Sequence, residues 1–169
     1  MTDPLRPALV LDTNAVLDWL AFDNAAMRPV AAAITAGAVR LISSAACIEE
    51  LQRALGYKAV RLDAAAQAHV LATYRRQSIL VEAPLAGTSP VLPRCEDPDD
   101  QKFLELAWHA GARWLVTRDK ALLKLASKMQ KLAGAEVIPP SQFKFPRNDA
   151  FSADGHLGLQ AYWKIAGKR

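Results

Sequence analysis

Four acidic residues stand at positions from which their carboxylates could meet in one site. Asp12 directly follows a run of four apolar residues, and Asp119 comes three residues after the shorter apolar run 114–116. Glu50 and Asp100 each lie in a stretch with a helical pattern. The successive separations are 38, 50 and 19 residues, so only the folded chain can bring these side chains together.

Carboxylates that share a pocket repel one another unless protons or cations neutralise them. Mg²⁺ and Mn²⁺ suit this task because they are hard cations that prefer oxygen ligands and keep water molecules that a phosphate can replace. One or two such ions can activate water and stabilise the leaving oxygen of a phosphodiester. We therefore predict metal-dependent phosphodiester hydrolysis, with Asp12, Glu50, Asp100 and Asp119 as catalytic residues and metal ligands.

Glu49 and Glu50 are alternatives for the second acid, and helical geometry separates them. At 100° per residue, Glu50 lies on the side of the small residues Cys47 and Ala54. Glu49 instead shares a face with Arg53, four residues further on, which is typical of a solvent-exposed ion pair. The pattern favours Glu50.

Each acid also has an ordinary structural explanation. Asp97 precedes a proline and is typical of a helix N-cap, and Asp99 would interact favourably with the dipole of the same helix. We interpret these two residues as parts of a helix start. Asp100 is compatible with the same role, and Asp119 could cap the helix that follows it. The combination of acids, more than any single one, indicates a site.

Other kinds of chemistry have little support. His69, His109 and His156 lack a serine or cysteine in a matching nucleophile motif, and Cys47 and Cys95 are not at metal-ligand spacing. The phosphate-binding pattern G-x-x-x-x-G-K-[ST] does not occur either. These observations argue against a hydrolase triad, a zinc ribbon and a P-loop nucleotide site.

The elements that must position the acids alternate along the chain. β-type runs at residues 8–11, 39–42, 79–82, 113–116 and 136–138 are separated by helical patterns at residues 15–22, 30–37, 45–55, 63–78 and 99–110. This alternation predicts an α/β fold, a three-layer α/β/α sandwich with a mainly parallel central sheet. Sites in such folds lie beyond the carboxyl ends of the strands, where Asp12 and Asp119 are expected.

We expect one domain over residues 1–143 and a basic C-terminal extension over residues 144–169, with a surface loop at residues 83–98. The formal charge is −2 for residues 1–119 and +6 for residues 120–169. The basic part favours a polyanionic partner, although a solvated basic surface explains the charge equally well. No stretch is long and apolar enough to cross a membrane, so a cytoplasmic protein without a membrane partner is expected.

Three segments together resemble the PIN-domain ribonucleases, in particular the VapC-like toxins of type II toxin-antitoxin systems. The segments are residues 9–14, residues 48–51, and residues 97–103 with their continuation to 115–120. The resemblance covers roughly residues 8–143, and the last segment is its most specific part. It implies a PIN-like α/β/α sandwich and Mg²⁺- or Mn²⁺-dependent cleavage of single-stranded RNA by an endoribonuclease.

The acids of that family fall on the same four residues, and its accompanying polar residues fall on Asn14 and Thr117. By the same resemblance, we expect a homodimer and an antitoxin protein that occupies the acidic groove. Charge and closeness to Asp119 suggest Arg118, Lys120 and Lys124 as contacts for the RNA backbone.

Two other functions are open to a sequence of this kind. A PIN scaffold could bind RNA or a protein without cleaving, but such a scaffold is expected to have lost an acid, and all four are present. A magnesium-dependent phosphatase of the haloacid dehalogenase type also begins with a strand and an aspartate. Its second aspartate is expected two residues later, where this chain has Asn14, and this mismatch disfavours the phosphatase.

Overall fold

The computed structural model describes residues 6–82 and 92–145, and its centre is a five-stranded sheet. All neighbouring strands pair in parallel, in the order β3-β2-β1-β4-β5. The strands are β1 (Ala8–Leu11), β2 (Arg40–Ser43), β3 (Ser78–Leu80), β4 (Trp114–Val116) and β5 (Glu136–Ile138). The prediction of a parallel sheet is confirmed.

Helices connect the strands in the predicted alternation. They are α1 (Thr13–Leu20), α2 (Arg28–Thr35), α3 (Ala45–Leu55), α4 (Ala64–Gln77), α5 (Gln101–His109), α6 (Lys120–Leu123) and α7 (Ala126–Ala133). Short 3₁₀ turns lie at Ala25–Met27, Pro98–Asp100 and Pro140–Gln142. No helix in the described part of the chain is long and apolar enough to span a bilayer.

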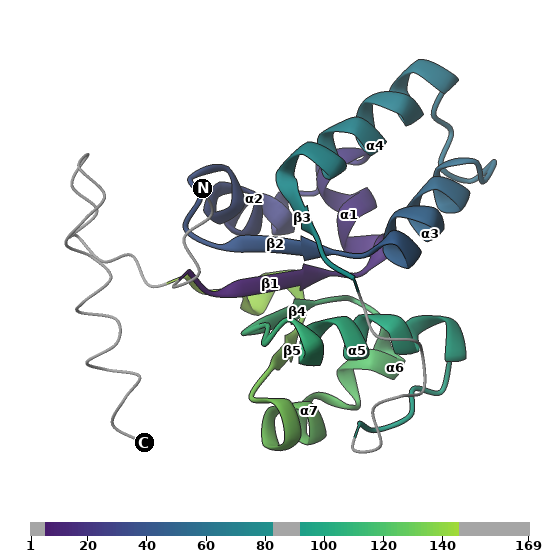
Figure 1. Cartoon of the computed structure of the whole chain (residues 1–169). Helices are drawn as coiled ribbons and strands as arrows, with labels where there is room; N and C mark the ends of the chain where they lie inside the picture. The colour runs from purple at the N-terminus through teal and green to yellow at the C-terminus, as the bar shows by residue number, and fades with distance from the viewer. Residues whose placement is uncertain (1–5, 83–91, 146–169) are drawn as a thin grey trace.

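Both faces of the sheet are buried, as the residues of β1 illustrate. Leu9 and Leu11 belong to a core with side chains of α1 to α4, whereas Ala8 and Val10 belong to a second core with side chains of α5 to α7. Successive strand residues point to opposite faces, so an all-apolar strand serves two cores. Figure 1 shows the resulting layers, with α1 to α4 on one side of the sheet and α5 to α7 on the other. The three-layer sandwich is therefore confirmed.

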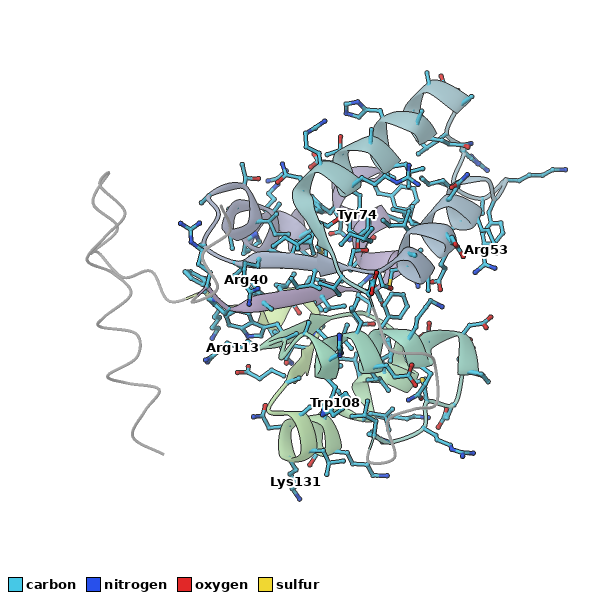
Figure 2. The ribbon with its side chains drawn as sticks, in the orientation of Figure 1. Arg40, Arg53, Tyr74, Trp108, Arg113 and Lys131 are labelled. Atoms are coloured by element: carbon cyan, nitrogen blue, oxygen red, sulfur yellow. The ribbon has the colours of Figure 1, made fainter. Side chains whose placement is uncertain are left out.

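Tyr74 of α4 illustrates how the first helical layer is held to the sheet. Its side chain points from α4 toward the sheet (Figure 2) and is only 1% exposed. The same core contains Leu51 and Leu55 of α3, so α3 and α4 pack against one another over the strands. Burial of the Tyr74 phenol raises its pKa above the ordinary value.

The order of the strands reverses between β1 and β4. From β1 the chain proceeds to β2 and β3 on one side, and then returns to place β4 and β5 on the other side. In open parallel sheets, this reversal point opens a crevice beyond the carboxyl ends of the two strands, and ligands bind there. The two ends adjoin directly, because the Asp12 amide donates a hydrogen bond to the Val116 carbonyl oxygen at 3.2 Å.

Several element boundaries differ from the predictions, and helix capping explains two of them. α1 begins at Thr13, earlier than predicted, because the Asp12 carboxylate accepts a hydrogen bond from the Ala15 amide and caps the helix. The helix expected from residue 99 begins as a 3₁₀ turn, in which the Asp97 carboxylate accepts from the Asp99 amide. The expected helical stretch after Asp119 divides into α6 and α7.

Two sequence predictions fall largely beyond the described ranges. Of the predicted loop at 83–98, residues 83–91 lie outside them, and so do residues 146–169 of the predicted extension. Phe145, two residues past the predicted domain boundary, contacts the Trp114 ring edge-on with centroids 6.2 Å apart. Phe143 contacts the same ring at 5.2 Å.

Candidate functional site

Asp12 lies at the reversal point and is almost completely buried, with 2% of its surface exposed. Its Oδ1 accepts from the Ala15 amide at 2.6 Å, and its Oδ2 accepts from the Thr117 hydroxyl. Each carboxylate oxygen can accept a second interaction after the first. These two donors therefore fix the orientation of Asp12 and leave lone pairs for a cation.

The segment after β4 contributes Thr117 and Asp119. The Asp119 amide donates to the Thr117 Oγ1 at 2.9 Å, so one hydroxyl links both acids of the two strand ends. Asp119 also caps α6, since its Oδ1 accepts from the amides of Ala121 and Leu122 at 2.6 and 3.2 Å. The capping role and the proposed site role of Asp119 are compatible, because capping occupies Oδ1 alone.

Asp100 ends the 3₁₀ turn Pro98–Asp100 that leads into α5. Its carboxylate forms no hydrogen bond or ion pair with the rest of the described residues, and its side chain is half-buried. The turn therefore presents an acid whose oxygens are free to bind a ligand.

Glu50 projects from α3 toward the same region, whereas Glu49 is exposed. Its Oε1 accepts a hydrogen bond from the Thr13 hydroxyl, and its Oε2 forms an ion pair with the Lys102 ammonium. Thr13 opens α1 and Lys102 lies in the first turn of α5, so Glu50 connects three helices around the site.

The pKa values of Asp12 and Asp100 are raised, in part because other carboxylates lie nearby. The pKa of Asp12 rises from 3.8 to about 6, mainly because of burial and further because of the negative charges of Asp100 and Asp119. The pKa of Asp100 also rises to about 6, through burial and then through the charges of Asp119, Asp97 and Glu50. Acids from four segments thus act on one another electrostatically.

The chemistry of this donor set fits Mg²⁺ or Mn²⁺. All of the donors are carboxylate oxygens, and a divalent cation would relieve the repulsion that adds to burial in raising the pKa values of Asp12 and Asp100. As the side chains lie, no three His, Cys, Asp or Glu residues within 6–82 and 92–145 are close enough together to enclose a metal ion. The positive charge next to Glu50 is the Lys102 ammonium.

An open pocket of about 500 Å³ lies beside Asp119, and its lining residues are Asn14, Arg118, Asp119, Lys120 and Ala121. Lys120 is exposed and forms no ion pair with any other residue that the structure describes. Asn14, predicted as a supporting residue, also lies on this wall and is exposed.

The other two predicted RNA contacts have partners within the protein. Arg118 binds Asp18 with two nitrogens, Nε to Oδ2 at 2.7 Å and Nη2 to Oδ1 at 2.8 Å. Lys124 forms an exposed ion pair with Glu96 at 3.0 Å. Arg118 therefore also has a structural role, because Asp18 is buried in α1 and the pair fixes the loop after β4 to that helix.

Sequence reasoning missed Thr13, Asp18 and Lys102. The signal for Asp18 was present, since a charged residue in the apolar helix 15–20 needs a buried partner. Thr13 and Lys102 carry no local signal, because their shared partner Glu50 lies on another helix.

Comparisons with known proteins identify the family of the chain. A family model described as PIN domain matches residues 8–121, which include all four acids. One similar solved structure is the crystal structure of PAE2754 from Pyrobaculum aerophilum, which is 21% identical, covers 79% of this chain and 90% of its own, and has a TM-score of 0.49. No curated protein matches the chain. The family match spans most of the chain and includes both strand ends of the site, so the chain belongs to the PIN domain family.

Proposed function

We propose that this protein is a divalent-cation-dependent endoribonuclease that hydrolyses phosphodiester bonds of single-stranded RNA. The observation that carries this proposal is the link between Asp12 and Asp119 through Thr117 at the reversal point of the sheet, with Asp100 near enough that the charges of these acids add to burial in raising the pKa values of Asp12 and Asp100. Membership of the PIN family, whose members are generally nucleases, supports it.

Asp12, Glu50, Asp100 and Asp119 would hold one or two Mg²⁺ or Mn²⁺ ions. A bound cation would supply an acidified water and charge neutralisation at the phosphate. The chain itself would keep the site ordered. Thr117 and the Ala15 amide fix the Asp12 carboxylate, and Thr13 fixes one oxygen of Glu50.

RNA would approach along the pocket wall formed by Asn14 and Lys120. The Lys120 ammonium is exposed and can neutralise a backbone phosphate, and the Asn14 amide can hydrogen-bond to phosphate or sugar. Arg118 and Lys124 would contribute charge from the same side while bound to Asp18 and Glu96.

We further propose that the enzyme is a toxin of a toxin-antitoxin pair that acts as a homodimer in the cytoplasm. This part of the proposal is supported by the resemblance of the three motif segments to VapC-like toxins. An antitoxin would then cover the acidic site. Expression of the chain alone should arrest growth. Co-expression of the adjacent reading frame should restore growth, and its product should copurify with the chain.

The test of the nuclease function is incubation of the purified chain with end-labelled single-stranded RNA and Mn²⁺, with and without a chelator. Cleavage in Mn²⁺ is expected, and the chelator, Asp12→Asn and Glu50→Gln should each abolish it. Glu49→Gln is the matched control, because Glu49 is exposed on the same helix and should leave cleavage unchanged.

Cleavage that persists in the chelator or in Asp12→Asn would contradict the proposal. RNA binding without cleavage would indicate the scaffold function. Hydrolysis of a generic phosphatase substrate, with RNA left intact, would indicate the phosphatase.

A further inference from the structure

Lys102 is a cation built into the acidic site. Its ammonium forms an ion pair with Oε2 of Glu50 and also donates to the Asp99 carbonyl oxygen. The ion pair is largely shielded from water, since the Lys102 and Glu50 side chains are 19% and 21% exposed. Screening by solvent is weaker for such a pair than for one on the open surface.

Both oxygens of Glu50 are engaged in this arrangement. The Thr13 hydroxyl donates to Oε1, and Lys102 neutralises Oε2. The positive charge of Lys102 also acts on the next acid, because it lowers the pKa of Asp100 against the opposing effects of burial and of neighbouring carboxylates. One lysine thus pairs with Glu50 and acts through its charge on Asp100.

We propose that Lys102 is a positioning residue that holds Glu50 in the metal-free protein and is displaced from it by the divalent cation. This inference rests on the proposed metal-dependent function. A cation that binds Glu50 must compete with the ammonium for the same oxygen and overcome the repulsion between the two positive charges. Lys102 therefore sets the cation concentration at which the site fills.

The test is a measurement of Mn²⁺ affinity by titration calorimetry on the intact chain, without RNA. Lys102→Met removes the charge and keeps an unbranched apolar side chain, and it should bind Mn²⁺ about tenfold more tightly than the wild type. Lys131→Met is the charge-matched control, because Lys131 is exposed on the outer side of α7 (Figure 2). Lys131→Met and Lys102→Arg should both keep the wild-type affinity.

A double-mutant cycle separates competition at Glu50 from a general effect of charge. In a Glu50→Gln background, Lys102→Met should change the Mn²⁺ affinity by less than about twofold. Lys102→Gln provides the same comparison should the methionine variant fail to fold.

The inference is overturned if the wild type binds Mn²⁺ and Lys102→Met binds it no more tightly than Lys131→Met does. It is also overturned if the full gain persists in the Glu50→Gln background. Absence of Mn²⁺ binding by both the wild type and Lys102→Met would overturn the proposed function as well.

Discussion

The Thr117 hydroxyl donates a hydrogen bond to the Asp12 carboxylate, and the two residues are 105 positions apart in the sequence. Thr117 follows β4 and Asp12 follows β1, so this bond connects the carboxyl ends of the two strands between which the sheet order reverses. The same hydroxyl accepts from the Asp119 amide. Thr117 thereby sets the relative positions of two of the acids.

Replacement of Thr117 by valine should destabilise the protein and its site. Valine keeps the shape but leaves a buried oxygen of Asp12 and the Asp119 amide without their partner, which costs about 1–3 kcal/mol. The free energy of unfolding, measured with urea, should fall by that amount, and Mn²⁺-dependent cleavage should fall with it. Thr117→Ser retains the hydroxyl and should stay near the wild type. Equal stability of the valine and serine variants would show that the hydroxyl is dispensable.

The metal-free protein should lose stability as the pH rises from about 4 to about 7. The folded-state pKa values of Asp12 and Asp100 are raised to about 6 from 3.8. The folded protein therefore binds more protons than the unfolded chain in this range, and the associated stability is lost as the pH passes the folded values. Thermal unfolding in the presence of a chelator measures this dependence.

Asp100→Asn should flatten that pH dependence and raise the metal-free melting temperature near neutral pH. Protons and Mn²⁺ bind the same carboxylates, so Mn²⁺ should stabilise the wild type more at higher pH than at lower pH. A melting temperature that stays constant or rises with pH in the chelator would contradict the raised pKa values of Asp12 and Asp100.

The ion pair between Arg118 and Asp18 should contribute more to stability than the exposed pair between Lys124 and Glu96. Arg118→Ala leaves the Asp18 carboxylate, 4% exposed, without its cation, and we expect a loss of about 1–3 kcal/mol. Lys124→Ala should cost less than about 1 kcal/mol, since its pair is open to solvent. Urea denaturation of both variants gives the comparison. Equal losses would contradict a structural role for Arg118.

Lys120→Ala should weaken RNA binding without affecting the fold. Because one phosphate contact is lost, the slope of log affinity against log salt should decrease by about 0.7. Binding is best measured in an Asp12→Asn background, in which the RNA stays intact. Lys58→Ala is the charge-matched control, since Lys58 is exposed in the turn after α3. Loss of affinity in both variants alike would show a general charge effect rather than a contact.

The sequence predicts the fold well because the fold depends on patterns that are local. Apolar runs such as residues 8–11 and the helix of residues 45–55 appear in the structure with the predicted bounds. The same locality explains why helical geometry distinguishes the exposed Glu49 from Glu50.

Side-chain pairing across elements could not be predicted in the same way. Glu50 of α3 pairs with Lys102 of α5, and Asp18 of α1 pairs with Arg118 after β4. Both pairs form because the fold brings these elements together at the end of the sheet. Neither pair has a spacing that a helix or strand period would reveal. The sequence therefore predicts the acids as candidates, whereas the ion pairs of Glu50 with Lys102 and of Asp18 with Arg118 are found only in the structure.

We propose that acids from separate segments form one cation-binding site at the ends of β1 and β4. The most direct measurement is anomalous scattering from a crystal of the protein soaked with Mn²⁺. We predict a manganese peak within bonding distance of carboxylate oxygens of Asp12, Asp100 and Asp119. Manganese bound only elsewhere on the protein, or no peak at saturating Mn²⁺, would contradict the account.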